Sequence, residues 1–284
     1  MRFATYTSEN SEYAGVLSED LQAVICLNEY YPGLTMIELI SSYGWKLHEE
    51  IIKIRSEGTK FPLSEVSLEA PLPYPPRGII CIGKNYRDHI KEVAKTIDKS
   101  NDIPKYPIYF SKLVDKCVGP GGIIPYHKES EIQLDYESEL AVVIGKEGKN
   151  IPLDQVNEYI FGYTIVNDIS ERITQHKHLQ WFRGKSFDGS SPMGPWIVTK
   201  DEFKTPIELN VQSFVNGELR QNSNTREFIF DIPYIISDFS AGITLRPGDI
   251  IATGMGFNPP NYLKPGDEIE CRIENIGSLK NTVL

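Results

Sequence analysis

The segment "LDYESELAVVIGK", residues 134–146, places two carboxylates directly before an apolar run of strand character. The run extends from Leu140 to Ile144, and Glu137 and Glu139 precede it two positions apart. Successive side chains of a strand point to opposite faces, so residues two apart share a face. Two buried anions held side by side repel each other unless a positive group lies near them. The pair therefore predicts either the polar edge of a half-buried strand or a cation site.

Further strand-like segments surround this one in the sequence. They are residues 78–83, 107–112, 161–168, 195–199, 208–217 and 249–254, and Pro-Gly-Asp turns at 247–249 and 265–267 each introduce a strand. Helical patterns occur only around residues 85–97 and 170–179 in this part of the chain. We therefore predict an α+β, β-rich mixed fold in which sheets enclose a core and the loops gather at one mouth.

The first 70 residues have a different pattern. Short strands are expected at residues 2–7, 13–17 and 22–27, and apolar residues recur at helical spacing over residues 34–56. The segment "APLPYPPRG", residues 70–78, follows with four prolines, which exclude helix and ladder hydrogen bonding. We expect a domain boundary there, with a small N-terminal α/β domain at residues 1–72 and a larger β-rich domain at residues 73–284.

Composition excludes several functional classes. The 284 residues include 39 Asp and Glu against 29 Lys and Arg, a formal charge of -10 that argues against nucleic-acid binding. The four cysteines are scattered and form no CxxC pair, so a zinc site or a disulfide framework is not expected. The N-terminus lacks the apolar core of a signal peptide, and no run is long enough to span a bilayer. We expect a cytoplasmic protein without a membrane partner.

Asp168 ends the apolar segment 161–168 and has two interpretations. An acidic residue after a buried strand is commonly the N-cap of the next helix, and "NDISER" fits that role. Alternatively, a third carboxylate beside Glu137 and Glu139 would complete an oxygen-rich site suited to Mg²⁺ or Mn²⁺.

His89 and Glu92 lie three residues apart beside the apolar stripe of the predicted helix 85–97. At this spacing the two side chains are neighbours, which is typical of a surface ion pair. A carboxylate beside an imidazole also orients it and stabilises its protonated form, as a general base requires. The polar residues that follow fit either a loop that closes over substrate or an ordinary surface loop.

From about Gly78 to the C-terminus, the sequence resembles the fumarylacetoacetate hydrolase (FAH) family. The resemblance rests on pieces in fixed order: "GKNYRDHIKE", "PIYFSK", "LDYESELAVVIGK", "GYTIVNDIS" with "RITQ", "RGKSFDGSSPMGPWIV", "VNGELRQ", "IPYIISDFS" and "LRPGDIIATG". It implies that Glu137, Glu139 and Asp168 bind the metal, and that His89 and Glu92 form the dyad that activates water in acylpyruvase-like members. It also implies a homodimer, the family's mixed β-sandwich or roll, and a catalytic domain at residues 73–284.

The resemblance assigns substrate contacts to four further residues. Lys185, whose "GKS" lacks the first glycine of a phosphate-binding loop, would face a substrate carboxylate or oxyanion. Arg172 and Gln175 fall on one helical face, where they would otherwise be surface residues. Thr253 matches a position near the substrate carboxylate, although "TGMGFNPPNYL" departs from the common family wording "TGTPxGVG". His176 and His178 lie two apart in the predicted helix and are expected at the surface.

The implied enzyme is a Mg²⁺- or Mn²⁺-dependent hydrolase that cleaves C–C bonds of 2,4-dioxo acids, acylpyruvates or fumarylpyruvate, through a metal-stabilised pyruvate enolate. The same site would serve an oxaloacetate-type 2-oxo acid decarboxylase or a 2-hydroxyhepta-2,4-diene-1,7-dioate isomerase. The alternative without catalysis is a metal-dependent metabolite binder. In each case the partner is a small 2-oxo acid or dicarboxylate.

Overall fold

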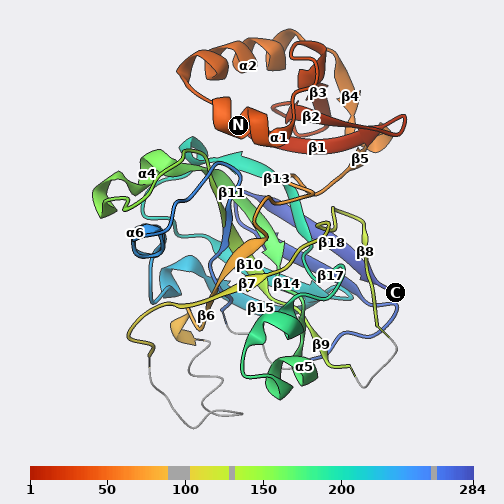
Figure 1. Ribbon diagram of the computed structural model, residues 1–284. Helices are drawn as coiled ribbons and strands as arrows, with labels where there is room; N and C mark the ends of the chain where they lie inside the picture. Colours follow the sequence, from red (N-terminus) through yellow and green to blue (C-terminus); the bar gives the residue numbers. More distant parts are fainter. Residues whose placement is uncertain (89–102, 128–131, 257–260) are drawn as a thin grey trace.

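The computed structural model describes residues 1–88, 103–127, 132–256 and 261–284 (Figure 1). Most of the predicted helix 85–97, including His89 and Glu92, lies outside the described residues. The described chain is rich in strands arranged in mixed sheets, which confirms the predicted fold class. All four cysteines are free and buried. None of the helices in these ranges combines the length and apolarity needed to cross a bilayer.

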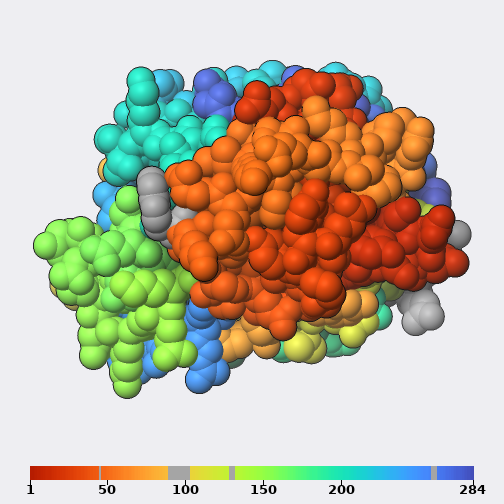
Figure 2. Space-filling model, turned by 90° about the horizontal axis from the view of Figure 1, so that it is seen from above, coloured from red at the N-terminus to blue at the C-terminus, as the bar shows by residue number. Residues whose placement is uncertain are grey.

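The N-terminal part consists of short antiparallel strands and two helices, drawn in red and orange in Figure 1. The strands are β1 (Arg2–Ser8), β2 (Ser11–Leu17), β3 (Ala23–Cys26), β4 (Lys60–Pro62) and β5 (Ser67–Leu68), with the 3-10 turns η1 (Leu27–Glu29) and η2 (Leu63–Glu65) between them. Figure 2 shows this part spread over one face of the molecule.

The single helical pattern expected over residues 34–56 is two helices in the structure. Helix α1 (Met36–Ser42) begins with a capping box between Thr35 and Glu38, and α2 (Trp45–Glu57) follows after a break at Tyr43 and Gly44. Gly44 is extended and is the N-cap of α2. Glycine is a poor residue for a helix interior. The helix is therefore interrupted at Gly44, although the helical spacing of apolar residues continues past it.

A large sheet runs through the whole molecule. Within the described residues it has 11 strands in the order β4-β3-β2-β1-β13-β11-β10-β16-β6-β7, with β5 paired to β1. Strand β1 joins β13 through the pairs Arg2↔Val198 and Phe3↔Ile197, so hydrogen bonds connect the N-terminal strands to the rest. The remaining strands are β6 (Ile79–Gly83), β7 (Ile108–Lys112), β10 (Ser138–Ile144), β11 (Ile160–Asn167), β13 (Met193–Thr199) and β16 (Ile250–Ala252). The large sheet therefore continues across the boundary at residue 72, which stays a prediction.

A second sheet packs against the first, and its order is β15-β14-β17-β18-β8. Its strands are β8 (Ile123–Ile124), β14 (Asn210–Val215), β15 (Glu218–Asn224), β17 (Glu268–Ile273) and β18 (Gly277–Val283), and β9 (Leu134–Asp135) pairs separately with β12 (Ser170–Glu171). The core between the sheets includes Leu140, Val142, Val211 and Ile269, which alternate inward as a sandwich requires.

Short helices connect the strands in this part of the described chain. They are α4 (Val156–Tyr159), α5 (Arg172–Lys177) and α6 (Ile232–Ser240), with 3-10 turns η3 (Leu153–Gln155), η4 (Trp181–Lys185), η5 (Lys200–Glu202) and η6 (Thr225–Glu227). Helix α5 is shorter than the predicted helix 170–179. Its N-cap is Glu171, whose side chain accepts hydrogen bonds from the backbone N–H groups of Ile173 and Thr174. Asp168 is therefore not the cap of this helix.

Candidate active site

The ends of three neighbouring strands meet at one place in the large sheet. Strand β10 lies between β11 and β16 and is antiparallel to both. The pair Ser138↔Asn167 brings the start of β10 to the end of β11, and the pair Ala141↔Ala252 brings it to the end of β16. Because antiparallel strands alternate in direction, residues just before β10 and just after its two neighbours lie at the same edge.

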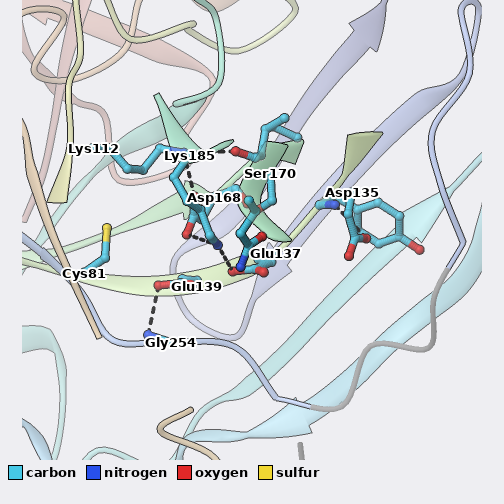
Figure 3. Close-up of polar contacts among 12 residues, drawn as sticks. Cys81, Lys112, Asp135, Glu137, Glu139, Asp168, Ser170, Lys185 and Gly254 are labelled. Carbon is cyan, nitrogen blue, oxygen red and sulfur yellow. Dashed lines mark hydrogen bonds and ion pairs between the residues drawn. The ribbon is translucent and has the colours of Figure 1, made fainter. Parts of the chain in front are cut away.

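Glu137, Glu139 and Asp168 converge at this edge (Figure 3). One carboxylate oxygen from each lies within 4.8 Å of the others, and all three side chains are buried. Strand β10 begins at Ser138, so Glu137 precedes the strand that was expected to carry both glutamates. Its backbone N–H instead donates to Oδ1 of Asn167, while its carbonyl accepts from the N–H of Asp168. The three carboxylates predicted to bind metal are thus together.

Two buried lysines contact the acidic cluster. Nζ of Lys185, at the end of η4, lies 2.7 Å from Oε2 of Glu137 and 2.6 Å from Oδ2 of Asp168. Nζ of Lys112, at the end of β7, lies 2.5 Å from Oδ1 of Asp168 and also donates to the carbonyl of Ile169. Both carboxylate oxygens of Asp168 therefore accept from an ammonium group.

Arg172 forms a third cationic contact, on the other side of Glu137. Its guanidinium donates to Oε1 of Glu137 at 2.5 Å, to Oδ2 of Asp135 at 2.7 and 2.9 Å, and to Oε1 of Gln175 at 2.8 Å. The prediction that Arg172 and Gln175 share a helical face is confirmed by this hydrogen bond. In this structure the guanidinium holds carboxylates of the protein itself.

The pKa values within the cluster diverge. Burial raises the pKa of Glu139 well above its ordinary value, and the negative charges of Asp168 and Glu137 raise it further. Burial also acts to raise the pKa of Glu137, but Lys185 and Arg172 outweigh it and hold that pKa below the ordinary value. Burial would lower the pKa of Lys185, yet the charges of Asp168 and Glu137 raise it, so Lys185 is an ammonium at neutral pH.

Thr253 and Gly254 follow β16 and lie beside Glu139. The Thr253 side chain is fully buried, and its hydroxyl donates to the carbonyl of Leu140 at 2.8 Å. The N–H of Gly254 donates to Oε2 of Glu139 at 2.8 Å. Thr253 is thus placed at the site edge, with its hydroxyl hydrogen directed to strand β10. His176 and His178 are exposed, as expected.

Several residues at the site were not identified from the sequence. Lys112 and Asp135 each end a short strand, and Gly254 acts through its backbone. The signal for Lys112 was a single charged residue directly after the apolar segment "PIYFS". The signal for Asp135 was a third acidic residue in "LDYESE".

The donor set fits a hard divalent cation. Mg²⁺ and Mn²⁺ favour carboxylate oxygens, and three converge here within 4.8 Å of one another. Among the described residues, the cluster joins four carboxylates, Asp135, Glu137, Glu139 and Asp168, to three cationic groups, Lys112, Arg172 and Lys185. With all four carboxyls ionised, one formal negative charge is left. Burial and the charges of Asp168 and Glu137 raise the pKa of Glu139, so a cation bound beside it would stabilise its ionised form. Glu137, Glu139 and Asp168 are the residues that would hold the ion.

Known proteins resemble the chain over its whole length. Residues 78–284 match the family model "Fumarylacetoacetate (FAA) hydrolase C-terminal". Oxaloacetate tautomerase YisK of Bacillus subtilis (strain 168) is 42% identical over 306 aligned positions that cover 100% of both chains. The solved fumarylacetoacetate hydrolase of psychrophilic Exiguobacterium antarcticum has a TM-score of 0.84 and 36% identity, covering 100% of this chain and 99% of that one.

A further solved structure was determined with ligands. Maleylpyruvate hydrolase of Sphingobium sp. SYK-6, in complex with manganese(II) and pyruvate, superposes with a TM-score of 0.82 and 29% identity, covering 100% of this chain and 99% of that one. The names of these three relatives include both hydrolases and a tautomerase, so the shared fold is compatible with more than one reaction.

Proposed function

Because the chain belongs to the fumarylacetoacetate hydrolase family, whose members named above are enzymes, we propose that it interconverts the enol and keto forms of a small 2-oxo dicarboxylate of the oxaloacetate class. The observation that carries the proposal is the buried cluster of Glu137, Glu139 and Asp168 around Lys185, in a chain that aligns end to end with an oxaloacetate tautomerase. We therefore favour the proton-shift reaction over hydrolysis of a C–C bond, which was the first expectation from the sequence.

Charge supports an anionic substrate. The cluster carries one formal negative charge among the described residues, and a bound dication would make it positive, which attracts a dicarboxylate even in an acidic protein. When bound, Mg²⁺ or Mn²⁺ would polarise the 2-oxo group and the adjacent carboxylate as a Lewis acid.

Lys185 has a defined part in this proposal. Its raised pKa keeps it an ammonium, so it acts as a fixed cation and not as a base. It is held by Glu137 and Asp168, and a cation fixed before the reaction stabilises negative charge that develops on the substrate's C2 oxygen.

The proton transfer needs two further groups. In the enol-to-keto direction the C2 hydroxyl loses a proton and C3 gains one. We assign this exchange to His89, supported by Glu92, on the family resemblance alone, since both lie outside the described residues.

A second candidate is hydrolysis of the C3–C4 bond in an acylpyruvate. It is favoured by the structural similarity to maleylpyruvate hydrolase, which was solved with manganese and pyruvate. The same residues would serve: Lys185 would hold the oxygen at C2, and His89 with Glu92 would remove a proton from the attacking water.

One set of assays separates the reactions. Metal-stripped protein reloaded with Mn²⁺ is given enol-oxaloacetate, and loss of enol absorbance is followed against the spontaneous rate. Release of pyruvate from oxaloacetate reports decarboxylation, and cleavage of acetylpyruvate reports hydrolysis. We expect acceleration of enol loss, abolished in Lys185→Met and retained in Lys116→Met, a surface lysine paired with Glu69. Enol loss at the spontaneous rate together with acetylpyruvate cleavage would replace tautomerisation by hydrolysis. Failure in all assays would contradict both.

A further inference from the structure

Asn85, just after strand β6, is fully buried between two other segments. Its Oδ1 accepts from the N–H of Phe230 at 2.9 Å, and its Nδ2 donates to the carbonyl of Phe230 at 3.1 Å. The same Nδ2 also donates to the carbonyl of Thr253 at 2.9 Å. The bonds to Phe230 reproduce a strand-like pairing, whereas the bond to Thr253 reaches toward the acidic cluster.

The peptide group between Thr253 and Gly254 connects Asn85 to Glu139. Its carbonyl accepts from Asn85, and its N–H donates to Oε2 of Glu139 at 2.8 Å, the contact drawn in Figure 3. The C=O and N–H of a trans peptide point in opposite directions, so a donor that fixes the carbonyl also aims the N–H. The three groups form one chain of hydrogen bonds, in which each bond polarises the next.

The local backbone explains why this peptide needs a donor. Gly254 has a φ of +90°, and a Cβ there would lie 2.8 Å from the carbonyl oxygen of Ile82. Glycine is therefore required, but glycine also allows the widest range of backbone rotation. On the other side, the N–H and hydroxyl of Thr253 both donate to the carbonyl of Leu140. With Asn85 on the carbonyl, every polar atom of the 253–254 peptide has a partner. A flipped peptide would instead point its carbonyl oxygen at the Glu139 carboxylate.

We propose that Asn85 is a positioning residue for the metal site: through the 253–254 peptide it fixes the orientation of the Glu139 carboxylate toward a divalent cation. The inference rests on the proposed function, because it takes Glu139 as a ligand. Groups one step removed from a metal orient its ligands, and changing them typically weakens metal binding by about 10- to 100-fold.

Asn85→Asp tests the proposal with a matched control. Aspartate keeps the shape and can still accept from the N–H of Phe230, but it loses the amide donor to the carbonyls of both Phe230 and Thr253. The control is Asn281→Asp on strand β18, because Asn281 is also buried and its Nδ2 also donates to two backbone carbonyls, those of Gly119 and Gly122. Each metal-free protein is titrated with Mn²⁺ by calorimetry and unfolded with urea. Asn85→Ala is measured in parallel because it adds no buried charge.

We expect both Asn85 variants to bind Mn²⁺ about 10- to 100-fold more weakly than wild type, with Asn281→Asp within about twofold. Equal weakening in Asn281→Asp would make the effect one of general destabilisation and overturn the proposal. Unchanged affinity in a cooperatively folded Asn85 variant would also overturn it. If neither variant folds, hydrogen exchange in the wild type decides: the Gly254 amide must exchange as slowly as strand β16. Absence of Mn²⁺ binding in the wild type would contradict the metal site itself. That result is distinct from normal wild-type binding that is unchanged in the Asn85 variants, which would contradict only the role of Asn85.

Discussion

The ammonium group of Lys112 lies 2.5 Å from Oδ1 of Asp168, and neither side chain is exposed to solvent. Lys185 approaches the other oxygen of the same carboxylate, so two cations from separate elements fix Asp168 in one orientation. A carboxylate held from both sides is preorganised before any ligand arrives, which lowers the reorganisation that binding requires.

Lys112→Met should destabilise the metal-free protein by about 3–5 kcal/mol, because it leaves a buried carboxylate without one of its cationic partners. Since the cluster becomes more negative, saturating Mn²⁺ should recover more stability in the variant than in wild type. Urea unfolding with and without Mn²⁺ measures both effects. Lys116→Met, which removes a partly exposed pair with Glu69, should change stability by no more than about 1 kcal/mol. Equal free energies of unfolding for Lys112→Met and wild type would show that the ion pair of Lys112 and Asp168 does not stabilise the fold.

Asp135 and Arg172 should be energetically coupled. Arg172→Gln leaves the buried carboxylates of Asp135 and Glu137 without their guanidinium partner. In the double variant, Asp135→Asn also removes the negative charge of Asp135. We expect a double-mutant cycle to give a coupling of about 1–3 kcal/mol in urea unfolding. The exposed pair of Arg220 and Glu218 is the control, with a coupling below about 1 kcal/mol. Additive effects of the two substitutions would mean that Arg172 is held mainly by other groups.

Glu171 should stabilise helix α5 in a pH-dependent way. Burial acts to raise its pKa, but hydrogen bonds from Thr174, Gln133 and Ile173 hold the pKa below the ordinary value of 4.5. A lowered pKa in the folded state means that the contribution is complete above pH 4.5 and is lost as pH falls through the folded-state value. Glu171→Ala should therefore cost about 1 kcal/mol at neutral pH. The difference from wild type should shrink in acid, and a difference that grows would contradict the assignment.

Glu92→Ala should separate chemistry from metal binding. If Glu92 supports His89 as the general base, the variant should lose about 100- to 10,000-fold in turnover. Its Mn²⁺ affinity should stay at the wild-type value, since Glu92 is not among the expected ligands. Steady-state assays with enol-oxaloacetate and acetylpyruvate, together with a Mn²⁺ titration, measure both properties. A full turnover rate in Glu92→Ala would remove the dyad from the mechanism.

The strands at the site could be predicted because their sequences are locally unambiguous. The β-branched runs that form β10 and β11 specify buried strands, whereas the meeting of the three carboxylates was expected only from the family resemblance. Helix α6 was not predicted, and its isoleucines by themselves favour a strand. Its apolar face, Ile232, Ile235 and Ile236, is buried against the core, so tertiary packing decides the conformation there.

The partners of the carboxylates could not be predicted in the same way. Lys112 reaches Asp168 from 56 residues away, and the Asn85 amide meets Thr253 across 168 residues. Such contacts depend on the register of several paired strands, which no local pattern contains. Asp168 shows the consequence: local sequence favoured a helix cap, and only the fold places it between two lysines.

Anomalous diffraction from crystals grown with Mn²⁺ tests the central claim most directly. We predict one manganese peak per chain within coordination distance of oxygens from Glu137, Glu139 and Asp168, lost in crystals of Glu139→Gln. A manganese peak elsewhere in an active preparation, or no peak near these oxygens at saturating Mn²⁺, would contradict the assignment of this cluster as the metal centre.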